Sequence, residues 1–241
     1  MNMVDERRLV PNDLRKPVYF DRVKLLDMVT RIVPSAFFLL AVLMRFSELY
    51  AFIVTDHTAG NAPALKFTAD MVSRVSTICL LGLLSVLFLI RLEPIRKAKG
   101  ILPRGLAIAG TFLVALVTFF PRAHLSTTQT VIASLLSLVG TGVSVFVLAH
   151  LGRSFSLMAE ARRLVTTGPY RVVRHPLYIF EAMASVGVLL QFLSFYTVAI
   201  FVVFMLIQFQ RMRNEEAVLE MAFPEYQDYK LKTARLIPGI Y

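Results

Sequence analysis

The sequence is short of charged residues. Only 17% of its 241 residues are Asp, Glu, Lys or Arg, whereas 56% are hydrophobic and the mean hydropathy is +0.65. An ordinary soluble domain carries about 25% charged residues. The shortage excludes an ordinary water-soluble globular domain and predicts an all-α integral membrane protein.

Other absences narrow the chemistry. A single cysteine, Cys79, lies inside an apolar run, which excludes a disulfide and a cysteine-based metal site. No P-loop, HExxH or GxSxG motif occurs. The sequence has one GxG, at Gly140 and Gly142, and it lies inside an apolar stretch instead of between a strand and a helix, which excludes a dinucleotide-binding fingerprint. The histidines lack metal-ligand spacing, so we expect no metal. Because no apolar leader stretch follows the first residues, we also expect no cleaved signal peptide.

The net charge of +10 does not indicate nucleic acid. The Lys and Arg residues fall between the apolar runs, where they act as topology signals and contacts to lipid headgroups. A nucleic-acid partner is therefore excluded, and membrane lipids are the expected partners. The sequence does not determine the oligomeric state.

Five apolar blocks predict the membrane-spanning helices: residues 32–54, 75–90, 105–121, 125–149 and 176–210. The last block has 35 residues. A straight helix of that length would reach about 52 Å, well beyond the roughly 30 Å of hydrocarbon. We therefore predict a tight helical hairpin that turns near residues 191–196, and about six transmembrane helices in all.

The distribution of positive charge supports six spans. With the N-terminus inside, the cytoplasmic segments 1–31, 91–104, 151–175 and 211–241 contain 22 Lys and Arg residues, against 3 in the outer segments. This asymmetry follows the positive-inside rule and predicts that both termini are cytoplasmic. The compact length and the lack of eukaryotic sorting signals favour a bacterial inner membrane. We see no internal repeat or linker, so we expect a single structural domain.

Two polar segments flank the predicted hairpin: LVTTGPYRVVRHPLY at residues 164–178 and RMRNEEAVLEMAFPEYQDY at residues 211–229. Pro176 is placed to begin a helix, and helix N-termini favour anions. Arg211 and Glu215 are four residues apart on one helical face. The hairpin would bring both segments to the cytoplasmic membrane boundary. The same Arg211 and Glu215 are also compatible with an ordinary surface ion pair.

Several other polar residues have structural alternatives. Arg174 is compatible with a membrane anchor, and His175 with a helix cap. Arg45 and Glu48 lie inside the first span, where they are costly in lipid, so we expect them to pair with each other. Glu181 faces either the site or a partner helix.

The two segments, together with the terminal RLIP, resemble the isoprenylcysteine carboxyl methyltransferase (ICMT) family, whose motifs are shared by phospholipid methyltransferases. The resemblance covers residues 151–241, an ICMT-like catalytic region. Residues 1–150 form an N-terminal membrane region that matches only in being hydrophobic. The family implies S-adenosylmethionine (SAM) as methyl donor, S-adenosylhomocysteine as product, and a C-terminal helical segment that caps the cofactor site.

The resemblance also implies roles by position. Arg211 would hold the acceptor and Glu215 would contact the cofactor as the second catalytic residue. Phe155 departs from the family, whose prenylcysteine enzymes tend to carry a polar cofactor contact there. The implied cofactor pocket comprises Arg162, Arg163, Leu164, Val165, Tyr170, His175, Pro176, Leu177, Tyr178 and Glu215.

The chemistry favours a carboxylate acceptor, as in isoprenylcysteine. A carboxylate is already deprotonated at neutral pH and needs only alignment and desolvation, and arginine can orient it through two hydrogen bonds. An amine must first lose a proton, with Glu215, Glu216 or Glu181 as candidate bases. We therefore predict methylation of a lipophilic or lipid-attached acceptor.

Three alternatives remain. The first is N-methylation of a phospholipid or another amine. The second is an NADPH-dependent sterol-type reductase, which has a similar HPxY segment and IPGIY ending but more spans. The third is a membrane scaffold without catalysis.

Overall fold

The computed structural model describes residues 19–59 and 64–239 of the chain. Of the N-terminal segment expected in the cytoplasm, residues 1–31, the first 18 lie outside the described residues. Five segments are long and apolar enough to cross a membrane: Met28–Thr55, Asp70–Ile90, Leu102–Phe119, Thr127–Ser154 and Phe195–Ala222. The predicted class, an all-α integral membrane protein, is confirmed. Pro176–Gln191 is a shorter apolar helix of 16 residues.

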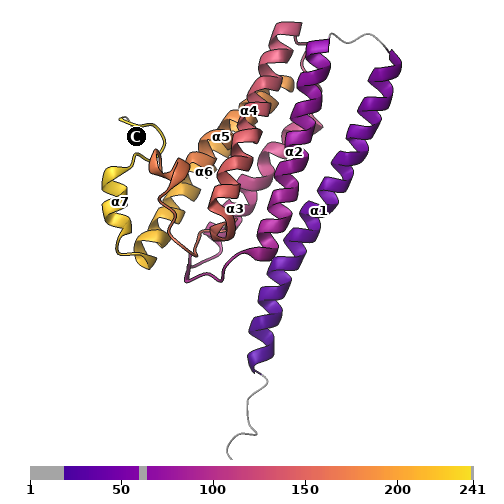
Figure 1. The fold of residues 1–241 in the computed structure, drawn as a ribbon. Helices are drawn as coiled ribbons and strands as arrows, with labels where there is room; N and C mark the ends of the chain where they lie inside the picture. The colour runs from indigo at the N-terminus through magenta and orange to yellow at the C-terminus, as the bar shows by residue number, and fades with distance from the viewer. Residues whose placement is uncertain (1–18, 60–63, 240–241) are drawn as a thin grey trace, which may run out of the picture.

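The elements follow one another as helices joined by short connections (Figure 1). The helices are α1 (Tyr19–Ala59), α2 (Ala64–Ile90), α3 (Leu102–Phe112), α4 (Thr127–Leu151), α5 (Pro176–Gln191), α6 (Phe195–Ala222) and α7 (Tyr226–Lys232). Tight 3-10 turns are η1 (Leu113–Phe119), η2 (Gly152–Ser154) and η3 (Gly168–Arg171). Two short strands are β1 (Arg96–Lys97) and β2 (Glu160–Ala161).

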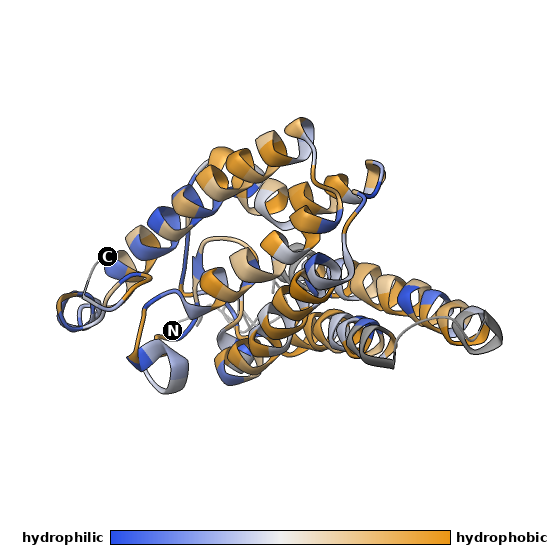
Figure 2. Ribbon diagram, turned by 90° about the horizontal axis from the view of Figure 1, so that it is seen from above, coloured by the Kyte–Doolittle hydropathy of each residue, from blue (hydrophilic) through white to orange (hydrophobic). Residues whose placement is uncertain are grey.

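The membrane helices form two layers. In the first, α1 packs on α2, α2 on α4, and α4 on α5; in the second, α3 packs on α6. Figure 1 shows α1 at one edge of the bundle and α7 at the other. Seen from above, hydrophilic residues gather along the second half of α6 and around α7 (Figure 2). We call this the polar end of the bundle.

The helices α4 and α5 approach each other closely because glycines face the partner helix. A Cβ on Gly140 would lie 2.4 Å from the backbone nitrogen of Ala184, and one on Gly187 would lie 2.4 Å from Oγ of Ser137. Small residues of this kind allow helix backbones in membranes to come together. The first arm of the predicted hairpin therefore packs along α4.

The chain turns at residues 192–194, inside the predicted window. Ser194 and Thr197 form a capping box that begins α6. Beyond the turn, α6 packs mainly along α3, while side chains of α5 and α6 still meet at Glu181–Gln208 and Tyr178–Glu215. The backbones of the two arms therefore lie farther apart than in the tight hairpin that the sequence predicts, and long side chains join them.

The longest helix, α1, contains Pro34. Proline has no N–H, so the carbonyl of Thr30 loses its helical partner. Nη2 of Arg91, at the end of α2, donates to that carbonyl at 3.1 Å and to Oγ1 of Thr30 at 2.9 Å. Arg91 thus satisfies the carbonyl that the proline leaves without a helical partner, and α1 extends beyond the predicted span of residues 32–54 at both ends.

At the polar end, three segments distant in sequence meet. β1 and β2 pair antiparallel, with Arg96 opposite Ala161, and both contact α6. The chain after α7 pairs with the loop before α5 through backbone hydrogen bonds. The amide of Arg174 donates to the carbonyl of Ala234 at 2.9 Å, and the amide of His175 donates to the carbonyl of Arg235 at 3.1 Å. These pairings position the polar side chains of the candidate site.

Candidate functional site

A cavity of about 550 Å³ lies between the two layers. Known ligand pockets span about 300–1,000 Å³, so the cavity is large enough for a small-molecule ligand. One end is lined by the polar loops that precede α5 and by the C-terminal half of α6. The other end reaches the membrane-spanning parts of α1, α2 and α3, where Phe37, Leu84 and Phe112 are among the lining residues. The cavity thus connects the polar end with the apolar part of the bundle.

The segment of residues 160–165 forms one wall. Arg162 is 4% exposed, lies 2.5 Å from Oε2 of Glu160, and donates to the carbonyl of Leu92. Burial lowers the pKa of the Arg162 guanidinium. Because its donors serve Glu160 and Leu92, Arg162 anchors the wall to the loop after α2. Arg163 is exposed and its Nε bonds Oγ of Ser154 at 3.2 Å.

The GPY turn of residues 168–170 is held from two sides. Gly168 has a φ of +58° and sits over the ring of His150, which an added Cβ would approach to 2.5 Å. The Tyr229 hydroxyl, from α7, donates to the carbonyl of Tyr170 at 2.6 Å. Burial raises the pKa of Tyr170 well above its ordinary value and that of Tyr229 to about 12, so both phenols stay protonated at neutral pH.

A buried carboxylate, Glu216, ties the two predicted segments to the C-terminal tail. Oε1 of Glu216 lies 3.0 Å from Nε2 of His175 and 2.9 Å from Nη1 of Arg174. Arg235 donates from Nε at 3.0 Å and from Nη2 at 2.6 Å. Arg174 is therefore an ion-pair partner inside the protein. His175 occupies the N-cap position of α5, as one alternative held, but its side chain makes no capping hydrogen bond and contacts Glu216 instead.

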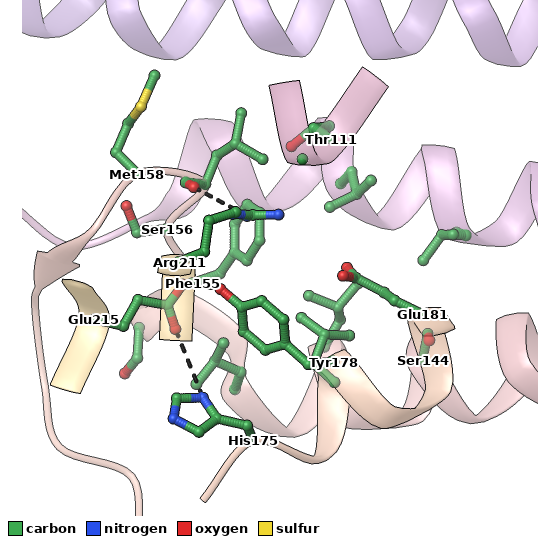
Figure 3. A pocket seen from close by; sticks show the side chains of 18 of the residues that line it. Thr111, Ser144, Phe155, Ser156, Met158, His175, Tyr178, Glu181, Arg211 and Glu215 are labelled. Carbon is green, nitrogen blue, oxygen red and sulfur yellow. Dashed lines mark hydrogen bonds and ion pairs between the residues drawn. The ribbon is translucent and has the colours of Figure 1, made fainter. Parts of the chain in front are cut away.

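Glu215, one residue earlier, points into the cavity. It accepts a hydrogen bond from the hydroxyl of Tyr178, and its Oε2 lies 3.9 Å from Nδ1 of His175 (Figure 3). The side chain of Glu215 is 26% exposed, against 4% for Glu216. Of the two adjacent glutamates, Glu215 is available to a ligand and Glu216 is enclosed by protein.

Arg211 is buried between α3, α6 and the loop that precedes β2. Its Nη1 donates to Oε1 of Gln208 at 2.7 Å, its Nη2 to the carbonyl of Leu157 at 3.4 Å, and its guanidinium lies 5.4 Å from the ring centre of Tyr178. Among the described residues, no carboxylate lies within 4.0 Å of Arg211. The alternative of a surface ion pair with Glu215 is therefore wrong.

Gln208 connects Arg211 to Glu181. Nε2 of Gln208 donates to Oε2 of Glu181 at 3.1 Å, while its Oε1 accepts from Arg211. Gly110 of α3 leaves the necessary space, because a Cβ there would lie 2.7 Å from Cδ of Arg211. The sequence left open whether Glu181 faces the site or a partner helix. It does both, because it lines the cavity and accepts a hydrogen bond from Gln208 of α6. Arg45 and Glu48 pair as expected, at 2.6 Å.

All of the predicted site residues line the cavity except Pro176, which is buried at the first turn of α5. Their catalytic and cofactor roles stay predictions. Phe155 is 4% exposed and its ring packs edge-on against Phe88 at 5.5 Å. Sequence reasoning missed Gln208 and Gly110. Gln208 could have been found because it lies three residues before Arg211, on the same face of the helix. No local sequence pattern indicates the role of Gly110.

Comparison with known proteins finds a family match within the C-terminal half of the chain. A sequence model described as "Isoprenylcysteine carboxyl methyltransferase (ICMT) family" matches residues 132–221. The chain is 31% identical over 136 residues to the nickel-cobalt-cadmium resistance protein NccN of Alcaligenes xylosoxydans xylosoxydans, a stretch covering 55% of this chain and 62% of NccN. It is 33% identical over 136 residues to the cobalt-zinc-cadmium resistance protein CzcN of Cupriavidus metallidurans (strain ATCC 43123 / DSM 2839 / NBRC 102507 / CH34), covering 54% of this chain and 60% of CzcN.

The chain therefore spans about three fifths of the length of these relatives. The family match covers α4, α5, α6 and the segment between α4 and α5, which together carry most of the polar residues around the cavity. Residues 132–221 thus resemble the isoprenylcysteine carboxyl methyltransferase family.

Proposed function

We propose that this protein is a SAM-dependent methyltransferase that esterifies the carboxylate of a lipophilic or lipid-attached acceptor, as in isoprenylcysteine. The observation that carries the proposal is Arg211. It is 9% exposed, lines the cavity and has no carboxylate within 4.0 Å among the residues that the structure describes. A buried charge is costly unless it is paired. Glu181 and Glu215 act on Arg211 only from a distance, so an acceptor carboxylate would supply the direct counter-ion.

Arginine also suits the alignment of such an acceptor. Its planar guanidinium can offer two parallel N–H groups to a carboxylate. Gln208 and the carbonyl of Leu157 hold the guanidinium in place, and Gly110 allows α3 to lie against it. The carboxylate is ionised at neutral pH, so the site needs no general base. The chain's contribution is orientation and the exclusion of water.

The residues at the polar end of the cavity fit SAM. When bound, SAM supplies a methyl group activated by a positively charged sulfur. Leu164 and Val165 offer apolar wall, and the half-buried carboxylate of Glu215 suits a cationic group. Tyr178 and His175 keep that carboxylate in position. α7 closes the polar end through the bond from Tyr229 to Tyr170.

The membrane arrangement belongs to the same proposal. We infer six crossings with both ends of the chain in the cytoplasm, because the loops at the polar end carry most of the Lys and Arg residues. At 16 residues, α5 is about 24 Å long and crosses with the help of the turn that follows it. The cavity then opens to water for the cofactor and to the bilayer for the acceptor.

The names of NccN and CzcN concern resistance to metals. In the described part of the chain, no three His, Cys, Asp or Glu side chains are grouped so that they could hold a metal ion. The proposal therefore rests on the cavity and does not include a metal. Because the chain spans only part of these relatives, their activity is not transferred to it.

Calorimetric titration of the detergent-purified full chain with SAM, S-adenosylhomocysteine and NADPH tests the cofactor. We expect saturable binding of the first two ligands. Saturation by NADPH alone would refute the proposal in favour of a reductase, and binding of none would favour the scaffold.

The bond formed is tested with radiolabelled SAM and a membrane extract. We expect the label in alkali-labile methyl esters, which release methanol. Label in alkali-stable N-methyl groups would instead support the amine methyltransferase. We expect Arg211→Ala to reduce transfer, and His175→Ala or Tyr178→Phe to weaken SAM binding. Equal loss of SAM affinity in all three variants would refute this division of roles.

A further inference from the structure

A buried glutamine stands between a cation and an anion behind the cavity wall. Gln208 lies in the membrane-spanning α6 and is 3% exposed, and the described residues that line the cavity do not include it. Its Oε1 accepts from Nη1 of Arg211 at 2.7 Å, and its Nε2 donates to Oε2 of Glu181 at 3.1 Å. The two ends of one amide are therefore bonded to opposite charges.

The orientation of the Gln208 amide follows from its two neighbours. Arginine can only donate hydrogen bonds and an ionised glutamate can only accept them. A flipped amide would place its NH₂ group against Arg211 and its carbonyl against Glu181, which is unfavourable at both ends. The amide thus acts as a spacer, because it holds the carboxylate of Glu181 near Arg211 but out of direct contact.

A second neutral group has the same place on another side of Arg211. The ring of Tyr178 has its centre 5.4 Å from the guanidinium, and its hydroxyl donates to Glu215 (Figure 3). Both carboxylates therefore act on Arg211 from a distance. Within the described part of the chain, Nε of Arg211 has no hydrogen-bond partner, yet it is not enclosed, whereas Nε of Arg162 and of Arg174 are enclosed without one.

We propose that Gln208 is a positioning residue of the acceptor site. It keeps the carboxylate of Glu181 off Arg211, so that the remaining N–H groups of the guanidinium stay open to the carboxylate of the acceptor. This inference rests on the proposed function, because that function gives Arg211 an acceptor to hold. A purely structural role, joining α5 to α6 within the membrane, would need the hydrogen bonds but not the amide's place between two charges.

The test compares two ligands that differ only in the charged group. Dissociation constants for myristate and methyl myristate are measured by calorimetry on the detergent-purified full chain. We expect the wild type to bind myristate about tenfold more tightly. In Gln208→Glu that ratio should fall towards one, because the new carboxylate takes the place of the ligand on Arg211. The matched control is Gln210→Glu, at an exposed position of the same helix, which should keep the wild-type ratio.

A swap of the two side chains separates position from net charge. The double variant Glu181→Gln, Gln208→Glu has the composition and charge of the wild type, but its acid lies beside Arg211. We expect it to lose the preference for myristate as well. Gln208→Glu should melt at or above the wild-type temperature, because its acid pairs with Arg211, so unfolding would not explain the loss. A wild-type ratio in the swapped variant would overturn the spacer role.

Titration of the same samples with S-adenosylhomocysteine tests the proposed function separately. A wild type that binds this ligand but binds myristate and methyl myristate equally would overturn the carboxylate acceptor, and the role of Gln208 with it. A wild-type preference that persists in Gln208→Glu would overturn the role of Gln208 alone. Absence of S-adenosylhomocysteine binding would overturn the methyltransferase, while the two myristate ligands would still decide what Gln208 does.

Discussion

Two buried charges near the end of α6 have opposite surroundings. Glu216 is enclosed by Arg174, His175 and Arg235, so its charge is balanced within the protein. Arg211 contacts an amide and a carbonyl but no described carboxylate within 4.0 Å. A buried charge in direct contact with its counter-ions organises structure, whereas one that faces a cavity without a carboxylate in direct contact can take a ligand there. At the scale of residues, this difference separates the framework of the site from its binding groups.

Replacing Arg211 by lysine keeps the charge but removes the planar pair of N–H donors. The ammonium group of lysine cannot offer the methyl acceptor's carboxylate two parallel hydrogen bonds. We therefore expect kcat/KM for the methyl acceptor to fall by about tenfold to a hundredfold. Binding of S-adenosylhomocysteine should change little. The control is Arg213→Lys, at an exposed position two residues on. Equal losses in the two variants would contradict the role given to Arg211.

Replacing Glu216 by glutamine leaves three basic groups without their shared anion. Loss of one partner from a buried ion pair costs about 3–5 kcal/mol, and we expect the lower end because Arg235 is partly exposed. The melting temperature in detergent should fall by several degrees. The matched control is Glu220→Gln, whose half-exposed pair with Lys230 is worth about 1 kcal/mol or less. An unchanged melting temperature in Glu216→Gln would contradict the proposed framework role.

At the scale of elements, glycines determine which helices touch. Gly140 and Gly187 allow α4 and α5 to pack backbone against backbone, and Gly110 allows α3 to lie against the side chain of Arg211. The apolar helices differ little in hydropathy, so burial of apolar surface does not select partners within the membrane. Partners are selected by how closely two helix backbones can approach each other, which small residues allow. The result is two layers with the cavity between them, in place of one continuous bundle.

The contact between α4 and α5 can be tested within one GxG motif. An added Cβ at Gly140 would collide with α5, whereas at Gly142 it would meet nothing within 4 Å. We expect Gly140→Ala to destabilise the protein by roughly 1–3 kcal/mol through overpacking. Gly142→Ala should be neutral or stabilising by up to about 1 kcal/mol, since alanine is the better helix former. Thermal unfolding in detergent measures both; equal effects would contradict the close contact.

At the scale of the whole molecule, the cavity joins two environments. Its polar end is made by loops and by α7, and its apolar end by α1, α2 and α3. The N-terminal membrane region therefore contributes walls to the site as well as anchoring it. In the proposed reaction, the water-soluble cofactor would enter the cavity from its polar end and the apolar acceptor from its apolar end.

The orientation of the molecule can be measured with cysteines. In a Cys79→Ser background, we expect Lys97→Cys and Glu225→Cys to react with a membrane-impermeant maleimide only after cells are permeabilised. Arg122→Cys should react in intact cells, because the loop before α4 is expected outside. All three positions are exposed. Labelling of Glu225→Cys in intact cells would contradict six crossings and favour five.

The sequence by itself determined the membrane class, the position of each long helix and the end of the bundle at which polar side chains gather. These properties depend on hydrophobic run lengths, charge placement and local motifs, all of which are read along the chain. The turn at residues 192–194 and the pairing of the 164–178 and 211–229 segments follow from the same local signals.

Only the tertiary structure decided which helices are partners and which of two adjacent glutamates is free. Glu215 and Glu216 are indistinguishable in the sequence EE, because their difference arises from Tyr178, Arg174 and a tail residue that is 19 positions away. The packing of α4 on α5, and the place of Arg211 against α3, involve close contacts at Gly140, Gly187 and Gly110. Such contacts join residues far apart in the chain, so no local pattern reveals them.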